Sequence, residues 1–89
     1  MNSVHAIISG LVQGVGFRYF AARQASANGI TGYARNLANG EVEVLAHGDR
    51  AVLERFLADL RVGPRSAMVR GVRVSWEGSD ETFGGFEIR

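Results

Sequence analysis

The sequence predicts an α+β fold, in which two helices cover one face of an antiparallel β-sheet. Three observations support this prediction: two segments carry apolar residues at helical spacing, several segments have the composition or the period of strands, and the connections between them are short. The chain has 89 residues, which is the size of one small domain. We therefore expect residues 1–89 to form a single domain.

A glycine-marked turn separates the first predicted strand from the first predicted helix. Residues 4–12 are apolar, contain β-branched side chains and lack proline, which is typical of a buried strand. The turn follows at residues 13–16. Apolar residues then recur at helical spacing from Phe17 to about Asn28. Gly29 ends this helix, because glycine tolerates the left-handed conformation that often follows a helix.

A hairpin is predicted after the first helix. Residues 33–38 can be extended, and Asn39-Gly40 favours a type I′ turn, because both central residues of that turn need a positive φ. The next strand, residues 41–47, has a period of two, so that one of its faces packs against the core. The residues on that face are Val42, Val44 and Ala46.

The second predicted helix begins after Asp49, which is a good N-cap residue. Gly63-Pro64 ends this helix, because proline cannot continue it. Between these two points one apolar stripe follows the helix, and it consists of Val52, Leu53, Phe56, Leu57 and Leu60.

The last part of the chain predicts two more strands. Residues 68–76 alternate as in a strand, residues 78–85 form a polar loop, and residues 86–88 form a short edge strand. The predicted order is therefore βαββαβ with an extra strand at the edge of the sheet. Because the connections are short, both helices must lie on one face of the sheet, which is the arrangement of a ferredoxin-like sandwich.

The composition excludes several kinds of function. The chain has no cysteine, which rules out disulfides, zinc knuckles and thiol catalysis. Its net charge is +1, so it lacks the basic field of a general nucleic-acid binder. It has no basic leader and no run of about 18 apolar residues. We therefore expect a cytoplasmic protein with neither a membrane nor a nucleic acid as a partner.

The turn between the first strand and the first helix is a candidate anion site. Its glycines allow backbone N–H groups to point inward, and the first turn of a helix adds unpaired N–H donors and a partial positive charge. Arg18 follows directly, and its planar guanidinium can bind two phosphate oxygens at once. Taken alone, glycines before a helix more often reflect ordinary turn chemistry.

Two motifs resemble the signature of the acylphosphatase family. They are QGVGFR at residues 13–18 and GYARN at residues 32–36, followed by a turn glycine. Further segments along essentially the whole chain are also similar to this family, among them the C-terminal Phe86-x-Ile88-Arg89. The resemblance implies a hydrolase that cleaves the carboxyl-phosphate anhydride of a small acyl phosphate into a carboxylate and inorganic phosphate. It implies neither a metal nor another cofactor.

The resemblance also implies the roles of individual residues. Arg18 corresponds to the residue that holds the phosphoryl group, and Asn36 to the residue that orients the attacking water. We expect Asn36 to lie near the end of the first strand. A general acid is not required, because the leaving carboxylate has a conjugate acid with a pKa of about 4. The predicted phosphate cradle consists of Gly14, Val15, Gly16, Phe17 and Arg18.

Two other functions stay open at this point. RNA-recognition modules share the βαββαβ order and stack bases on aromatic residues of the sheet, but the strand at residues 41–47 has no aromatic residue and two acids. A non-catalytic phosphate- or anion-binding domain, like the acylphosphatase-like unit of hydrogenase-maturation proteins, is the other alternative. We expect a monomer, because no apolar stripe is evident beyond the predicted core.

Several other residues receive ordinary structural interpretations. His5 and His47 lie in separate strands without a nearby carboxylate pattern, so we expect structural roles for both. Arg35 is left outside the site as a solvent-exposed residue. The spacing of Phe20, Phe56, Leu57 and Trp76 is that of core residues, and Arg23, Arg55, Arg61, Arg70 and Arg73 are interpreted as solvated.

Overall fold

The order of helices and strands along the chain agrees with the prediction. The computed structural model describes residues 1–76 and 81–89, so the predicted loop at 78–85 lies partly outside the described residues. None of the described helices is long and apolar enough to cross a membrane. The elements are β1 (Asn2–Leu11), α1 (Phe17–Ala27), β2 (Thr31–Asn36), β3 (Val42–Gly48), α2 (Arg50–Val62), β4 (Met68–Ser75) and β5 (Phe86–Ile88).

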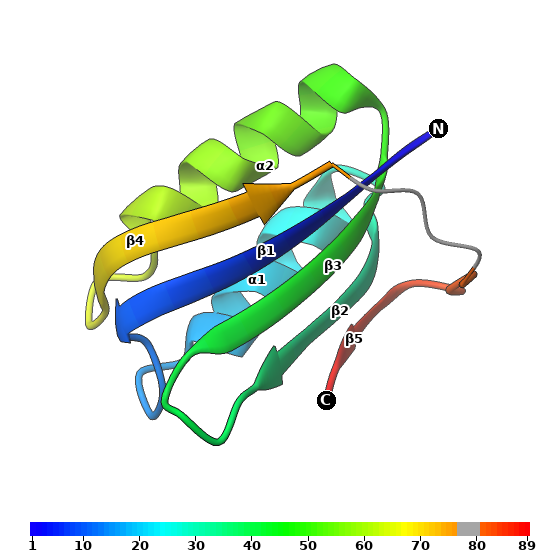
Figure 1. Ribbon diagram of the computed structural model, residues 1–89. Coiled ribbons are helices and arrows are strands. Elements are labelled where there is room, and N and C mark those ends of the chain that lie inside the picture. Colours follow the sequence, from blue (N-terminus) through cyan, green and yellow to red (C-terminus); the bar gives the residue numbers. More distant parts are fainter. Residues whose placement is uncertain (77–80) are drawn as a thin grey trace.

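The strands form one sheet in the order β4-β1-β3-β2-β5, and both helices cover the same face of it (Figure 1). This arrangement confirms the ferredoxin-like sandwich. The four strands β1 to β4 are antiparallel, as predicted, and the extra edge strand β5, whose direction was not predicted, pairs parallel with β2. The reason is geometric. β4 runs antiparallel to β2, so the end of β4 lies at the same edge of the sheet as the start of β2. β5 also starts at this edge, with Phe86 beside Gly32, and therefore runs in the same direction as β2.

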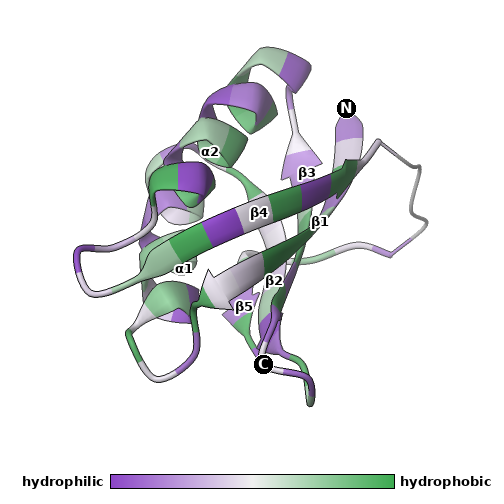
Figure 2. Ribbon diagram, turned by 60° about the vertical axis from the view of Figure 1, so that its left-hand side comes forward, coloured by the Kyte–Doolittle hydropathy of each residue, from purple (hydrophilic) through white to green (hydrophobic). Residues whose placement is uncertain are grey.

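The core lies between the helices and the sheet. Alternate residues of β1 are buried, and the predicted core face of β3 is confirmed, since Val42, Val44 and Ala46 are at most 1% exposed. Hydrophobic and hydrophilic residues alternate in the second half of β4, from Val72 to Ser75, as Figure 2 shows. Of the four predicted core aromatic and aliphatic residues, Phe56 and Leu57 are buried, while Phe20 and Trp76 are partly buried and pack against the core.

The predicted ends of the helices are mostly confirmed. Gly29 follows α1 with a φ of 67°, and the N–H of Ile30 donates to the carbonyl of Ala25 at 2.9 Å, which closes a Schellman motif. Gly63 follows α2 with a φ of 74°. Asp49 occupies the N-cap position of α2, but its side chain makes no capping hydrogen bond within the described residues.

The turn between β2 and β3 differs from the predicted type I′ turn. Every described residue with a positive φ is a glycine, so Asn39 does not adopt the conformation that this turn requires. The Asn39 side chain instead accepts a hydrogen bond from the backbone N–H of Glu41 at 3.0 Å, a local bond that favours a negative φ. Leu37 pairs with Glu41 across a three-residue loop, in which Gly40 has a φ of 94°.

Candidate active site

The loop between β1 and α1 has the backbone conformation of an anion-binding turn. Gly14 and Gly16 have φ values of 75° and 78°, a region that residues with a Cβ atom rarely adopt. An added Cβ would meet nothing within 4 Å at either position, so the backbone conformation and not the available space requires glycine. Gly16 is the N-cap of α1, and no side chain among the described residues caps this helix. The first N–H groups of α1 are therefore available to an anion.

A cavity of about 230 Å³ brings the two predicted catalytic residues together. Asn36 is the last residue of β2 and Arg18 lies in the first turn of α1. The strand register explains their proximity, since Val42 pairs with Asn36 on one side and with Ile8, near the end of β1, on the other. The residues that line the cavity are Val12, Gly14, Gly16, Phe17, Arg18, Tyr19 and Asn36.

Val15 is the one residue of the predicted cradle that is not part of this lining. Its side chain is partly buried and packs against the hydrophobic core. Because Val15 lies between Gly14 and Gly16, its side chain anchors the loop to the core while the two glycines face the cavity.

Arg18 is held by the C-terminal part of the described chain. Its Nη1 donates a hydrogen bond to the backbone oxygen of Arg89 at 2.8 Å. Arg18 takes part in none of the side-chain ion pairs among the described residues. The contact with Arg89 was not predicted, because the two residues lie 71 positions apart and no local pattern links them.

Gln13 connects the loop to the hairpin that carries Asn36. Its side-chain nitrogen donates to the carbonyl oxygens of Leu37 and Glu41, at 2.7 and 2.9 Å. These two residues flank the β2–β3 turn. This role of Gln13 was not predicted from the sequence, although its position at the start of the first motif was an available signal.

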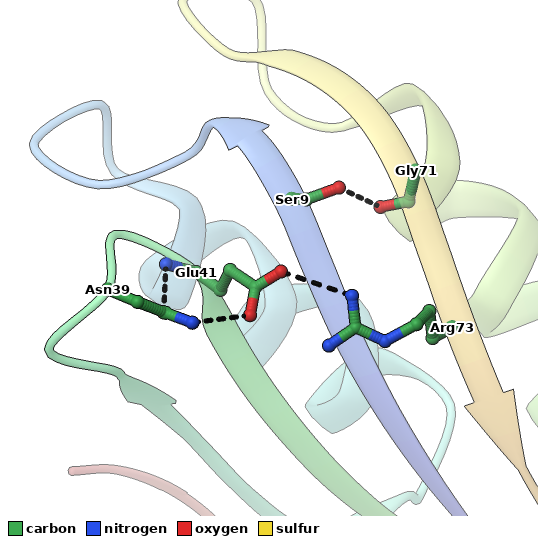
Figure 3. Close-up of polar contacts among 5 residues, drawn as sticks. All are labelled: Ser9, Asn39, Glu41, Gly71 and Arg73. Atoms are coloured by element: carbon green, nitrogen blue, oxygen red, sulfur yellow. Dashed lines mark hydrogen bonds and ion pairs between the residues drawn. The ribbon is translucent and has the colours of Figure 1, made fainter.

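A second set of polar contacts fixes the same hairpin from its other side. Glu41 accepts hydrogen bonds from the Asn39 side chain at 2.8 Å and from Arg73 of β4 at 3.3 Å (Figure 3). The hydrogen bond from Asn39, followed by the one from Arg73, holds the pKa of the Glu41 carboxyl below its usual value. Arg73 is 70% exposed, as predicted, yet it pairs with a carboxylate.

A cluster around Glu43 lies on the sheet face that the helices leave open. His5 Nε2 lies 2.8 Å from one carboxylate oxygen of Glu43, and Arg35 forms an ion pair with the other at 2.6 Å. Burial raises the pKa of Glu43, but the hydrogen bond from His5 and the charge of Arg35 together outweigh it, so that this pKa is lowered. The expectation that His5 has no nearby carboxylate was wrong, because Glu43 reaches it from the neighbouring strand β3.

His47 is buried among side chains of the open face. Its Nδ1 lies 2.7 Å from the hydroxyl oxygen of Ser3, and its ring lies 5.5 Å from the ring of Phe83. Within the described part of the chain, no group of three or more histidine and carboxylate side chains could hold a metal ion. The structural role predicted for both histidines remains a prediction.

Comparisons with known proteins agree on one family. A model of the acylphosphatase family matches residues 4–88. An acylphosphatase of Dehalococcoides mccartyi (strain CBDB1) is 49% identical over 90 residues, which cover 100% of this chain and 99% of that relative. The crystal structure of acylphosphatase from Bacillus subtilis superposes with a TM-score of 0.95 at 34% identity, covering 100% of this chain and 99% of the other.

A larger protein contains a similar unit. Full-length HypF, in a phosphate- and nucleotide-bound form, matches with a TM-score of 0.89 at 25% identity over 99% of this chain and only 12% of its own length. The match to the family over nearly the full chain, and to relatives of almost equal length, is the more specific finding. This chain belongs to the acylphosphatase family.

Proposed function

We propose that this chain hydrolyses acyl phosphates by binding the phosphoryl group between Arg18 and the β1–α1 loop, while Asn36 holds the attacking water. The observation that carries this proposal is the cavity that Arg18, the loop glycines and Asn36 share. The first N–H groups of α1 and one guanidinium supply fixed positive charge where the phosphoryl oxygens would lie. A neutral amide beside them can orient water without competing for the cationic site.

The reaction follows from these positions. The oxygen of the water forms a bond to phosphorus, the bond between phosphorus and the acyl oxygen breaks, and the carboxylate leaves with the bonding electron pair. One proton of the water passes to solvent, so the products are a carboxylate and inorganic phosphate. The leaving carboxylate needs no proton, because its conjugate acid has a pKa of about 4. Charge on the phosphoryl oxygens in a loose transition state is stabilised by Arg18 and the loop amides.

The test is the hydrolysis of benzoyl phosphate in the presence of a chelator. We expect turnover by the wild type and a loss of about 100-fold or more in kcat for Arg18→Ala, since removing one donor from an oxyanion site has effects of this order. Asn36→Ala should lower kcat while leaving the inhibition constant of inorganic phosphate nearly unchanged. Arg23→Ala is the matched control, because Arg23 is exposed on the same helix and does not line the cavity.

Two results would contradict the proposal. If all variants fold and hydrolyse benzoyl phosphate at the wild-type rate, the assigned residues are wrong. If the wild type binds phosphate but hydrolyses no acyl phosphate, the chain is a non-catalytic anion-binding domain.

We also propose that residues 1–89 form one domain, which acts as a cytoplasmic monomer without a nucleic-acid partner. The open face supports the last point, since Tyr33 is only 8% exposed and lies under Phe83 and Arg89. An aromatic ring covered in this way cannot stack on a base. An RNA shift assay and sedimentation analysis of the purified protein would test these statements.

A further inference from the structure

The rim of the cavity carries an exposed aromatic side chain that the proposed chemistry does not use. Tyr19 lines the cavity and is 65% exposed. Phe17 and Val12, the other large apolar residues of the lining, are each 1% exposed, so their side chains belong to the core. Tyr19 is therefore the lining residue that presents a large apolar surface to a bound molecule.

No ring contact within the described part of the chain explains the exposed position of the Tyr19 ring. Among the described residues, it takes part in none of the ring–ring or cation–π contacts. A ring that stays largely in water gains little from burial on folding, so a smaller polar side chain would serve the helix equally well. Its exposure at the cavity suggests a contact with substrate.

The geometry of α1 places this ring beside the phosphate site. Tyr19 follows Arg18 directly in the first helical turn, and both side chains line the same cavity. With the phosphoryl group held by Arg18 and the loop, the acyl group of a substrate lies in the rest of the cavity or at its rim, where Tyr19 is exposed. The exposed ring is then a surface on which a flat acyl group can lie.

We propose that Tyr19 forms an acyl-group subsite that favours acyl phosphates with aromatic acyl groups over those with small aliphatic ones. This inference rests on the proposed function, since it assumes that the cavity binds acyl phosphates. The interaction is a ring–ring contact with the aromatic acyl group, made by the face of Tyr19 and not by its hydroxyl. It acts on substrate binding and leaves the phosphoryl chemistry to Arg18 and Asn36.

The experiment compares benzoyl phosphate with acetyl phosphate as substrates of the full chain. For Tyr19→Ala we expect KM for benzoyl phosphate to rise about fivefold with kcat nearly unchanged, the size of an aromatic pair contact. KM for acetyl phosphate should change by less than about twofold, because a methyl group offers little surface to the ring. Tyr19→Phe should retain the wild-type preference, and the inhibition constant of inorganic phosphate should stay constant in both variants.

Arg23→Ala is again the control, since Arg23 is exposed one helical turn further along α1 and lies outside the cavity lining. Its ratio of KM values for the two substrates should equal that of the wild type. Circular dichroism and thermal unfolding establish that each variant is folded.

The possible results separate the two proposals. An equal rise of KM for both substrates in Tyr19→Ala, or no rise for either, overturns the subsite while the hydrolase function stands. A wild type that hydrolyses neither acyl phosphate overturns the proposed function, and the subsite with it. A loss of preference in Tyr19→Phe would show that the hydroxyl and not the ring makes the contact, which also contradicts the inference.

Discussion

Glu43 shows how a single carboxylate can be kept charged in a partly buried position. Its side chain is 13% exposed, and burial by itself would favour the neutral form. His5, Arg35 and Tyr33 surround it with a hydrogen bond, a positive charge and a further hydrogen bond, and together they lower its pKa. Burial raises the pKa of Tyr33, and the charge of Glu43 and the hydrogen bond to it raise this pKa further, whereas the charges of Arg35 and Arg89 lower it.

The lowered pKa of Glu43 predicts acid-sensitive stability. The unfolded state has the ordinary carboxyl pKa of about 4.3 and binds the proton more readily, so this stability is present above that pH and is lost as the pH falls through the folded pKa. The free energy of unfolding should therefore decrease below about pH 4. Urea unfolding at several pH values measures this slope.

Glu43→Gln should flatten that slope, because glutamine does not titrate. Glu54→Gln is the matched control, since Glu54 is an exposed carboxylate on α2 whose one ion pair among residues 1–76 and 81–89 is with Arg50, four residues away. A slope in Glu43→Gln equal to that of the wild type would show that the cluster does not contribute.

The β1–α1 loop and the β2–β3 hairpin are two elements that meet through one side chain. Gln13 satisfies two carbonyl oxygens of the hairpin, and the other side of the hairpin is fixed by the contacts of Glu41. Asn36 ends the strand that enters this hairpin. The distance between Asn36 and Arg18 therefore depends on the hydrogen bonds of Gln13, which connect the loop to the hairpin.

Gln13→Ala should lower both the stability of the protein and its activity, because it removes the hydrogen bonds between the loop and the hairpin. Removing the donor takes two hydrogen bonds from the hairpin, although the Leu37 carbonyl still accepts the N–H of Gly40 and the Glu41 carbonyl that of Leu37. We expect a loss of stability of about 1–2 kcal/mol. We expect kcat for benzoyl phosphate to fall about tenfold, because small displacements of a positioning group have effects of this size or larger.

Two further variants define what Gln13 does. Gln13→Glu should behave like Gln13→Ala, because a carboxylate cannot donate to the carbonyls of the hairpin. Gln24→Ala, on α1 and outside the cavity lining, serves as the control for removing a glutamine. Wild-type kcat in Gln13→Ala, measured on folded protein, would show that the hairpin is positioned by other contacts.

At the scale of the whole molecule, β5 and Arg89 connect the C-terminal segment to the sheet and to α1. β5 adds to the edge of β2, and the backbone N–H of Arg89 donates to the carbonyl of Ala34 at 2.8 Å. The side chain of Arg89 lies over the ring of Tyr33, 4.2 Å from its centre, while its backbone oxygen accepts the hydrogen bond from Arg18. One residue thus contacts the edge of the sheet, its open face and Arg18 of the proposed phosphate site.

Arg89→Ala should loosen this end of the protein without removing any group from the cavity. The variant keeps the backbone oxygen that Arg18 contacts but loses the cation–π contact and the ion pairs with Glu81 and Glu87. We expect unfolding at a lower urea concentration and a higher KM for benzoyl phosphate, because Arg18 is held less firmly. Arg55→Ala, on an exposed position of α2, is the control. A KM equal to that of the wild type would show that β5 stays docked without the side chain.

The order of the elements, the core faces and the candidate site could be inferred from the sequence by itself. These features depend on residues that are neighbours along the chain. Examples are the apolar stripe of α2, the alternation in β3 and the glycines of the β1–α1 loop. For the same reason the two motifs could be compared with a family, and Arg18 and Asn36 could be chosen from them.

Contacts between residues that lie far apart in the sequence became known only from the tertiary structure. The bonds from Gln13 to Leu37 and from Arg18 to Arg89 span 24 and 71 positions, and they depend on strand register and direction. The parallel pairing of β5 with β2 and the approach of Glu43 to His5 also depend on how the strands are arranged in the sheet. Asn39 is the local exception: its propensity for a positive φ was overridden by a side-chain hydrogen bond that only the observed turn contains. Local sequence specifies which elements form, whereas the packing of the elements fixes which side chains meet.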